Sequence, residues 1–184
     1  MDNNDITFLS VQLKSLMTNN KARLLVDDPT LIKLIDNLCS YWYINEIEII
    51  NANEKNELPR HQYENSIWLL GETIRRCLSE QKRKREVNDL LDKVALVADR
   101  KQYGYGRVAF ILILSEFGNK KYVDLLRKFL HDDAVQLATL EALRIMKEPS
   151  VEREIMALFT STKKKWIMKE CEKYFRMLAK VKRD

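Results

Sequence analysis

The second half of the chain matches itself at a fixed distance of 29 residues, and this self-match limits what the chain can fold into. Apolar residues of residues 108–117 meet apolar residues in the same order in residues 137–146. The matched pairs are Val108 and Leu137, Ala109 and Ala138, Ile111 and Leu140, Ile113 and Ala142, Leu114 and Leu143, and Phe117 and Met146. In both segments the apolar residues follow helical spacing, so the period predicts a repeated helical unit.

A shorter helix is predicted after each of these two segments, over residues 121–131 and 150–160. The first long helix is expected to end at Gly118 in a left-handed conformation, and the second to end before Pro149. The two shorter helices match best at an offset of 30, which pairs Leu125, Leu126 and Phe129 with Ile155, Met156 and Phe159. A final helix, residues 163–179, should bury one face made of Trp166, Met168, Cys171, Tyr174 and Met177.

The N-terminal half is helical by periodicity alone. The full sequence has only four glycines and three prolines, which favours long helices with short connections over a β architecture. Asp28 before Pro29 predicts a helix start with the Asp28 carboxylate as its cap. Residues 51–62 are polar and aperiodic and predict a loop or a boundary between subdomains. Helices are expected at about residues 4–20, from 28 onward, and at 63–79 and 85–98, the last with Val87, Leu90, Leu91, Val94 and Leu96 inward. Residues 41–50 are interpreted as helix, with a short strand as the alternative because of Ile47, Ile49 and Ile50.

Three segments of the second half resemble HEAT or HEAT-like helical repeats. They are residues 108–117, the turn Asp132-Asp133-Ala134-Val135, and Leu137-Ala138-x-Leu140-x-Ala142-Leu143; the resemblance is clearest over residues 106–160. It implies an all-α fold, a short α-solenoid of stacked antiparallel helical hairpins, and most often a protein-binding scaffold. The length predicts a single domain, residues 1–184, with an N-terminal helical subregion at 1–60 and the hairpin stack at 63–184.

The net charge of +5 is unevenly distributed. Residues 1–92 hold 12 basic and 15 acidic residues, whereas residues 93–184 hold 20 and 12. This asymmetry suits an acidic partner or a nucleic-acid backbone, and it is also typical of a lysine-rich helical surface. Two basic clusters, residues 82–85 and 163–165, are either solvated surface or phosphate contacts.

Nothing in the sequence predicts a metal, a cofactor or a catalytic motif. His61 and His131 lie 70 positions apart, without a Cys-x-x-Cys or a His-x-x-x-His pair. The three cysteines, Cys39, Cys77 and Cys171, lie in apolar helical patterns and are expected to be buried free thiols. Together with an acidic, polar start and no long apolar window, they predict a cytoplasmic protein without a membrane segment.

The segment Tyr103-Gly104-Tyr105-Gly106-Arg107 has two interpretations. Its glycines, aromatic rings and arginine could bind a phosphate or stack on a base. It lacks the G-x-G-x-x-G spacing and a preceding strand, which favours a linker whose aromatic residues pack beneath the next helix.

These observations predict a non-catalytic binding protein that occupies a macromolecular partner, most often a protein; one version is a bacterial immunity protein that covers a toxin domain. The alternative is a nucleic-acid-binding protein that uses the basic half, in one version a DNA-base glycosylase. Glu152, Glu154, Glu170 and Glu172 lie near Trp166 and Tyr174, but they match no glycosylase motif and are more simply i to i+4 partners of Lys and Arg. The predicted binding face consists of solvent-facing positions on the shorter helices and the final helix: Lys121, Asp124, Lys128, Arg153, Glu154, Lys169 and Lys173.

Overall fold

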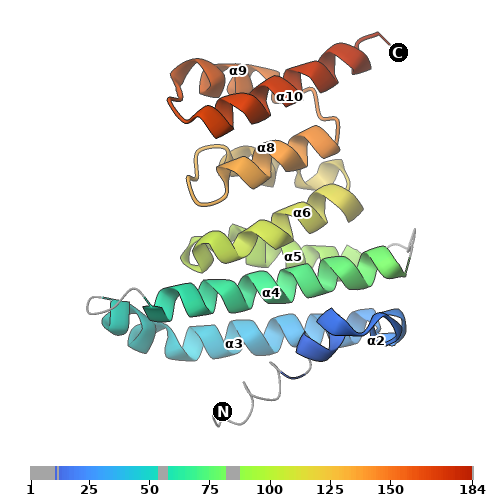
Figure 1. The fold of residues 1–184 in the computed structure, drawn as a ribbon, viewed down its shortest axis with the longest axis vertical. Helices are drawn as coiled ribbons and strands as arrows, with labels where there is room; N and C mark the ends of the chain where they lie inside the picture. Colours follow the sequence, from blue (N-terminus) through green and yellow to red (C-terminus); the bar gives the residue numbers. More distant parts are fainter. Residues whose placement is uncertain (1–10, 12, 54–57, 82–87, 184) are drawn as a thin grey trace. The chain divides into compact units, whose positions relative to one another are not determined.

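The computed structural model describes residue 11 and residues 13–53, 58–81 and 88–183, and for residues 41–53 and 58–62 it describes the backbone alone. Every regular element in these residues is a helix (Figure 1), which confirms the all-α prediction. Internal contacts divide the chain into two compact units, residues 1–110 and 111–184. The predicted subregion boundary near residue 60 stays a prediction. None of the described helices contains an apolar stretch long enough to cross a membrane.

The helices of the first unit whose bounds the structure gives are α2 (Asn20–Leu25), α3 (Asp28–Asn53), α4 (Leu58–Glu80), α5 (Asn88–Asp99) and the 3-10 helix η1 (Lys101–Arg107). Helix α4 is central, since it contacts α2, α3 and η1, while α5 contacts α3 and η1. Apolar residues at helical spacing face inward, because burying an apolar stripe stabilises an amphipathic helix more than its intrinsic propensity does. The buried side chains include Leu31, Leu34 and Ile35 of α3, Ile67, Leu70 and Ile74 of α4, and Leu90, Leu91 and Val94 of α5.

Several predicted boundaries in this unit change. Residues 41–50 are helical as expected, but α3 continues to Asn53 and α4 begins at Leu58, so the loop predicted over residues 51–62 is wrong for most of its length. Leu96 was expected to face inward and is instead 62% exposed, with Val97 buried in its place. Val87 lies outside the described residues. Of the first predicted helix, residue 11 and residues 13–18 are helical, and residues 1–10 and 12 lie outside the described part.

The start of α3 is capped one residue earlier than predicted. The Oδ1 atom of Asp27, not the Asp28 carboxylate, accepts a hydrogen bond from the Thr30 amide at 2.9 Å. A capping side chain reaches the amide two or three residues ahead of it, and Asp27 stands at that distance from Thr30. Asp28 then lies in the first turn, where a negative charge interacts favourably with the helix dipole.

The second unit begins within α6 (Val108–Phe117) and continues through η2 (Lys120–Tyr122), α7 (Val123–Phe129), α8 (Gln136–Ile145), α9 (Glu152–Ser161) and α10 (Lys165–Val181). Helix α8 packs against α7 and α10, and α10 also packs against α9. Figure 1 shows α8 and α10 side by side. These two helices occupy equivalent places in the predicted repeat.

The sequence offset of 29 residues has counterparts in burial and in local hydrogen bonding. Four matched pairs of α6 and α8 are buried in both members. The turn after each helix is also closed in the same way at the same offset of 29. Asn119 Oδ1 accepts from the Lys121 amide at 2.9 Å, and Glu148 Oε1 accepts from the Ser150 amide at 2.9 Å. The buried pairs are Ala109 and Ala138, Ile111 and Leu140, Ile113 and Ala142, and Leu114 and Leu143.

The shorter helices follow the same offset of 29, so the predicted match at 30 is wrong. Leu126 of α7 and Ile155 of α9 are both fully buried. Met156, which the offset of 30 pairs with Leu126, is 45% exposed. The apolar neighbours on these two helices made both alignments look acceptable, and only burial separates them.

The residue in a left-handed conformation after α8 is Lys147, with φ of 52°. Its amide donates to Arg144 O at 3.1 Å and the Glu148 amide donates to Leu143 O at 3.1 Å, which is the Schellman pattern of helix ends. Gly118 was expected to be left-handed, but the described residues with positive φ are Lys147 and Gly104. A Cβ atom at Gly118 would lie 2.3 Å from Leu114 O, so that glycine serves close packing instead.

We expect the substitution Lys147→Gly to raise the free energy of unfolding by about 1 kcal/mol, because glycine has no Cβ atom and relieves the strain of the left-handed conformation. The larger conformational entropy of glycine in the unfolded state offsets part of this stabilisation. Urea denaturation followed by circular dichroism measures the change. Lys147→Ala is the control, since it removes the charge and retains the Cβ atom. Equal stability of the two variants would contradict the assignment.

Candidate functional site

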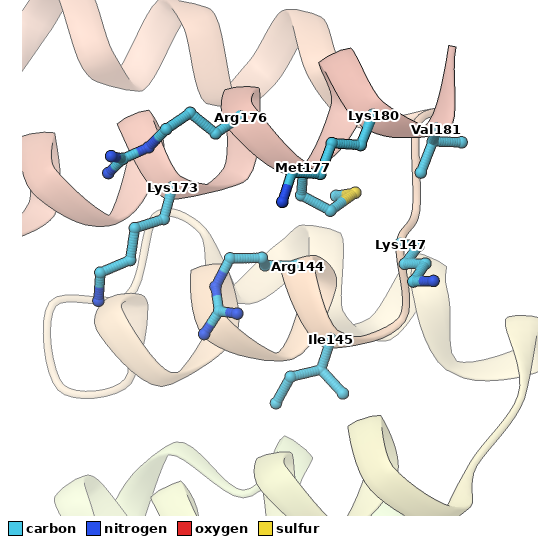
Figure 2. Close-up of a pocket in the computed structure, with 8 residues that line it drawn as sticks. All are labelled: Arg144, Ile145, Lys147, Lys173, Arg176, Met177, Lys180 and Val181. Atoms are coloured by element: carbon cyan, nitrogen blue, oxygen red, sulfur yellow. The ribbon is translucent and has the colours of Figure 1, made fainter. Parts of the chain in front are cut away.

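A pocket of about 610 Å³ lies between α8 and α10 in the second unit (Figure 2). This volume is in the range of pockets that hold small ligands or single side-chain clusters of a partner. None of the described residues that line it carries a carboxylate. The lining consists of five basic and three apolar residues: Arg144, Lys147, Lys173, Arg176 and Lys180 with Ile145, Met177 and Val181.

The orientation of α10 places its basic residues in this pocket. Its buried face is Ile167, Cys171, Tyr174 and Leu178, spaced by four, three and four residues. The Tyr174 hydroxyl donates to Glu148 O at 2.5 Å, which ties α10 to the turn after α8. The predicted face was wrong at Trp166, which is 60% exposed. Residues 173, 176, 177, 180 and 181 therefore fall together on the adjacent face, toward α8.

Glu170 holds two of the five pocket cations. Its carboxylate is buried and accepts from Arg144 Nε at 2.8 Å and from Lys173 Nζ at 2.7 Å. Burial alone would raise the pKa of Glu170, but the hydrogen bonds and charges of Lys173 and Arg144 outweigh it and hold the pKa below its ordinary value. Arg144 also lies 3.5 Å from a Glu141 carboxylate oxygen. These contacts compensate Arg144 and Lys173 within the protein.

The other three cations, Lys147, Arg176 and Lys180, make no ion pair with any residue that the structure describes. All three are exposed, and the apolar residues between them are partly exposed as well. In Figure 2, Met177 and Lys180 extend from α10 toward α8. This arrangement of cations and apolar side chains can attract an anion and give an attached apolar group a surface to contact.

No protein-family model, curated protein or solved structure matches this chain.

We expect Glu170→Gln to lower the free energy of unfolding at neutral pH by about 1–3 kcal/mol, the usual range for lost hydrogen bonds to charged groups. A depressed pKa in the folded state means that the Glu170 contribution is present above the ordinary value of 4.5 and is lost as the pH falls through the lower folded-state value. Urea denaturation at neutral and acid pH measures this. The stability difference between wild type and variant should shrink in acid; a constant difference contradicts the ion-pair role.

The predicted binding-face residues lie apart from this pocket, with one exception. Lys121, Asp124 and Lys128 belong to η2 and α7, Arg153 and Glu154 to α9, and Lys169 and Lys173 to α10, but only Lys173 lines the pocket.

Two of the predicted acidic residues take part in an ion-pair network. Asp124 and Glu154 meet through Arg127, whose Nη1 lies 2.9 Å from Asp124 Oδ1 and whose Nε lies 3.1 Å from Glu154 Oε1. Lys128, Arg153 and Lys169 are exposed and make no ion pair in the described part of the chain. The role of this face stays a prediction.

Sequence reasoning missed four of the pocket cations. Arg176 and Lys180 follow Lys173 at three and seven residues, so this face of α10 was readable from spacing. Arg144 and Lys147 carry no such signal, because they reach the pocket only through the packing of α8 against α10.

The segment Tyr103–Arg107 forms η1 of the first unit, and the packing that the linker interpretation predicts holds for Tyr103 but not for Tyr105, which is 52% exposed. Tyr103 is fully buried, and the backbone of η1 packs closely against α4. Arg107 is also buried, and its guanidinium donates to Gly104 O at 3.0 Å and Ala98 O at 3.4 Å. Tyr103 therefore has no free ring face for a base, and the glycines serve packing.

The other side chains that the sequence singled out, namely possible metal ligands, cysteines and carboxylates, form no further site in the described residues. No set of three or more His, Cys, Asp or Glu side chains there could hold a metal ion. Cys77 and Cys171 are buried free thiols, as predicted, and burial raises the pKa of Cys171 to about 11; Cys39 is half-buried instead. Of the proposed glycosylase carboxylates, Glu152 pairs with Lys182 at 3.0 Å, and Glu154 and Glu170 are paired as described above. The basic cluster at residues 82–85 lies outside the described residues.

Proposed function

We propose that this chain is a non-catalytic binding protein whose second unit holds an acidic region of a partner protein. The observation that carries the proposal is the pocket between α8 and α10, which five cations line without a carboxylate among the described lining residues. The charge of the whole chain supports it. Residues 111–184 contain sixteen basic and eleven acidic residues, whereas residues 1–110 contain sixteen of each, so the second unit carries the full net charge of +5.

The repeat supports the finer form of this proposal, a short HEAT-like solenoid. Helices α8 and α10 start 29 residues apart and pack against each other, as consecutive first helices of stacked hairpins do. In that arrangement the pocket belongs to the face that the first helices share. The predicted binding residues on α7 and α9 belong to the second helices. The two helix layers are therefore two competing binding faces.

Matched charge reversals separate these faces. The variant K147E/R176E/K180E reverses the uncompensated pocket cations, and K128E/R153E/K169E makes the same charge change in the same unit outside the pocket. We expect an acidic protein of the native host to crosslink to wild type and to the second variant, and to lose most of its crosslinking to the pocket variant. Loss with the second variant alone would move the site to the predicted face that contains Lys128, Arg153 and Lys169. A partner set that is identical for all three proteins contradicts the proposal.

An immunity protein that covers an acidic toxin domain is the most specific form of this function. It needs no chemistry from the chain, only occupation of the partner. Co-expression with toxins encoded beside the gene tests it directly: growth should be restored by wild type and not by K147E/R176E/K180E. If wild type does not relieve the growth arrest, the immunity-protein hypothesis is wrong. The general binding function is then tested by the crosslinking experiment alone.

Nucleic-acid binding is the second candidate, because the same three cations could neutralise phosphates. It predicts that log K falls with log salt with a slope of about −0.7 per phosphate on a single strand, so about −2 for three contacts. Filter binding with an oligonucleotide across a salt series measures the slope. If the filter retains no oligonucleotide at low salt, or if K147E/R176E/K180E does not change the retention, this use of the pocket is excluded.

A further inference from the structure

We propose that the pocket between α8 and α10 binds an acidic peptide segment of the partner that carries an apolar side chain between its carboxylates. The carboxylates would pair with Lys147, Arg176 and Lys180, and the apolar side chain would contact Met177 and Val181. This inference rests on the proposed function and specifies the chemistry of the segment that the pocket accepts.

The charges of the pocket divide into two classes, and only one is free for a ligand. Glu170 forms salt bridges with Arg144 at 2.8 Å and with Lys173 at 2.7 Å, and these contacts hold both cations in place. Lys147, Arg176 and Lys180 have no acidic partner in the described residues. Arg176 and Lys180 stand one helical turn apart on α10, about 6 Å along the axis, while Lys147 lies beyond the end of α8 at the other side of the pocket. A segment with carboxylates spread over several residues fits this distribution better than one compact anion.

The apolar lining selects between acidic ligands. Val181 is 38% exposed, and Met177 lies near it on α10 as a flexible side chain that adapts to a partner. An apolar side chain placed there would remove this surface from water. Sequence-independent nucleic-acid sites combine basic grooves with aromatic platforms, and the lining has no aromatic residue. A carboxylate-rich peptide with an apolar residue uses both parts of the lining.

The backbone around Lys147 is fixed before any ligand arrives. Its left-handed conformation is held by the two hydrogen bonds that close α8, and the Tyr174 hydroxyl fixes the carbonyl of the next residue, Glu148, against α10. A backbone that is already ordered at Lys147 lowers the ordering cost of binding, which is then limited to the side chain.

Fluorescence anisotropy with the full chain tests the inference. The probes are a labelled short peptide in which aspartate and glutamate flank one leucine, the same peptide with glycine for leucine, its Asn/Gln counterpart, and a single-stranded oligonucleotide. We expect the leucine peptide to bind, the glycine peptide to bind about tenfold more weakly, and the uncharged peptide not to bind. K147E/R176E/K180E should abolish binding, whereas K128E/R153E/K169E should retain it; equal thermal unfolding of both variants excludes misfolding as the cause.

The remaining outcomes separate the two proposals. Equal binding of the leucine and glycine peptides overturns the apolar contact and leaves the acidic-partner function standing. An oligonucleotide that binds more tightly than the peptides, and loses binding with K147E/R176E/K180E, overturns the inference in favour of phosphate recognition. If no probe responds to the pocket reversal, both the inference and the pocket-based function are wrong.

Discussion

Replacing Gly106 with alanine is expected to lower the free energy of unfolding by about 3 kcal/mol, the upper end of the usual cost of overpacking a core. A Cβ atom there would lie 2.7 Å from Glu64 O and 2.8 Å from Ile67 Cβ. Both atoms belong to α4, and Ile67 is fully buried, so neither can move away without shifting the helix. Relief of the contact therefore requires η1 to separate from α4.

The neighbouring glycine reinforces this expectation for a different reason. Gly104 has φ of 47°, and a Cβ atom there would lie 2.1 Å from Glu64 Oε1. Left-handed strain and the displacement of a buried carboxylate both act against Gly104→Ala. Tyr105→Ala, between the two glycines, is the matched control, since Tyr105 is 52% exposed and surface changes usually cost little.

Urea denaturation of the full chain gives the free energies of unfolding, and hydrogen exchange in α4 and α5 shows which unit is affected. The glycine variants should lose amide protection in the first unit. A Gly106→Ala protein within about 0.5 kcal/mol of wild type, the usual effect of a surface change, would show that η1 does not pack against α4 as described.

The second large effect concerns two adjacent residues of α9. Ile155→Ala is expected to cost about 2–5 kcal/mol, because it leaves a cavity in a fully buried position. Met156→Ala should cost less than about 1 kcal/mol, since the Met156 side chain is 45% exposed and already meets water. The pair differs by one position in sequence, so helix propensity and local context are closely matched.

Thermal and urea unfolding of these two variants also decide the repeat register. An offset of 29 aligns Ile155 with the buried Leu126, whereas an offset of 30 aligns Met156 with it. A larger cost for Met156→Ala than for Ile155→Ala would falsify the register that the structure gives. The same comparison on α7, Leu126→Ala against the half-buried Leu125→Ala, should reproduce the order.

Most helices could be predicted because their evidence is local. Apolar residues three and four apart mark a helix whatever lies beside it, so α6 and α8 were readable. Residues 41–50 were less clear, because their β-branched isoleucines also suit a short strand. Two of the errors lie within helices that were themselves predicted. Leu96 and Trp166 are apolar and close to the correct stripe, yet both are exposed, while Val97 and Ile167 are buried beside them. Where several apolar residues are adjacent, the buried stripe of a helix can be shifted by one residue with almost no change in the apolar spacing of the sequence.

What the sequence by itself determined is the all-helical class, the 29-residue repeat and the excess of positive charge in the second half, because spacing and charge are properties of the chain alone. Only the tertiary structure decided which cations meet. Arg144 and Lys147 join Arg176 and Lys180 because α8 packs against α10, and Glu170 compensates two pocket cations because that packing buries it between them. Contacts across helices depend on how side chains fill the space between them, and no periodicity along a single helix encodes that.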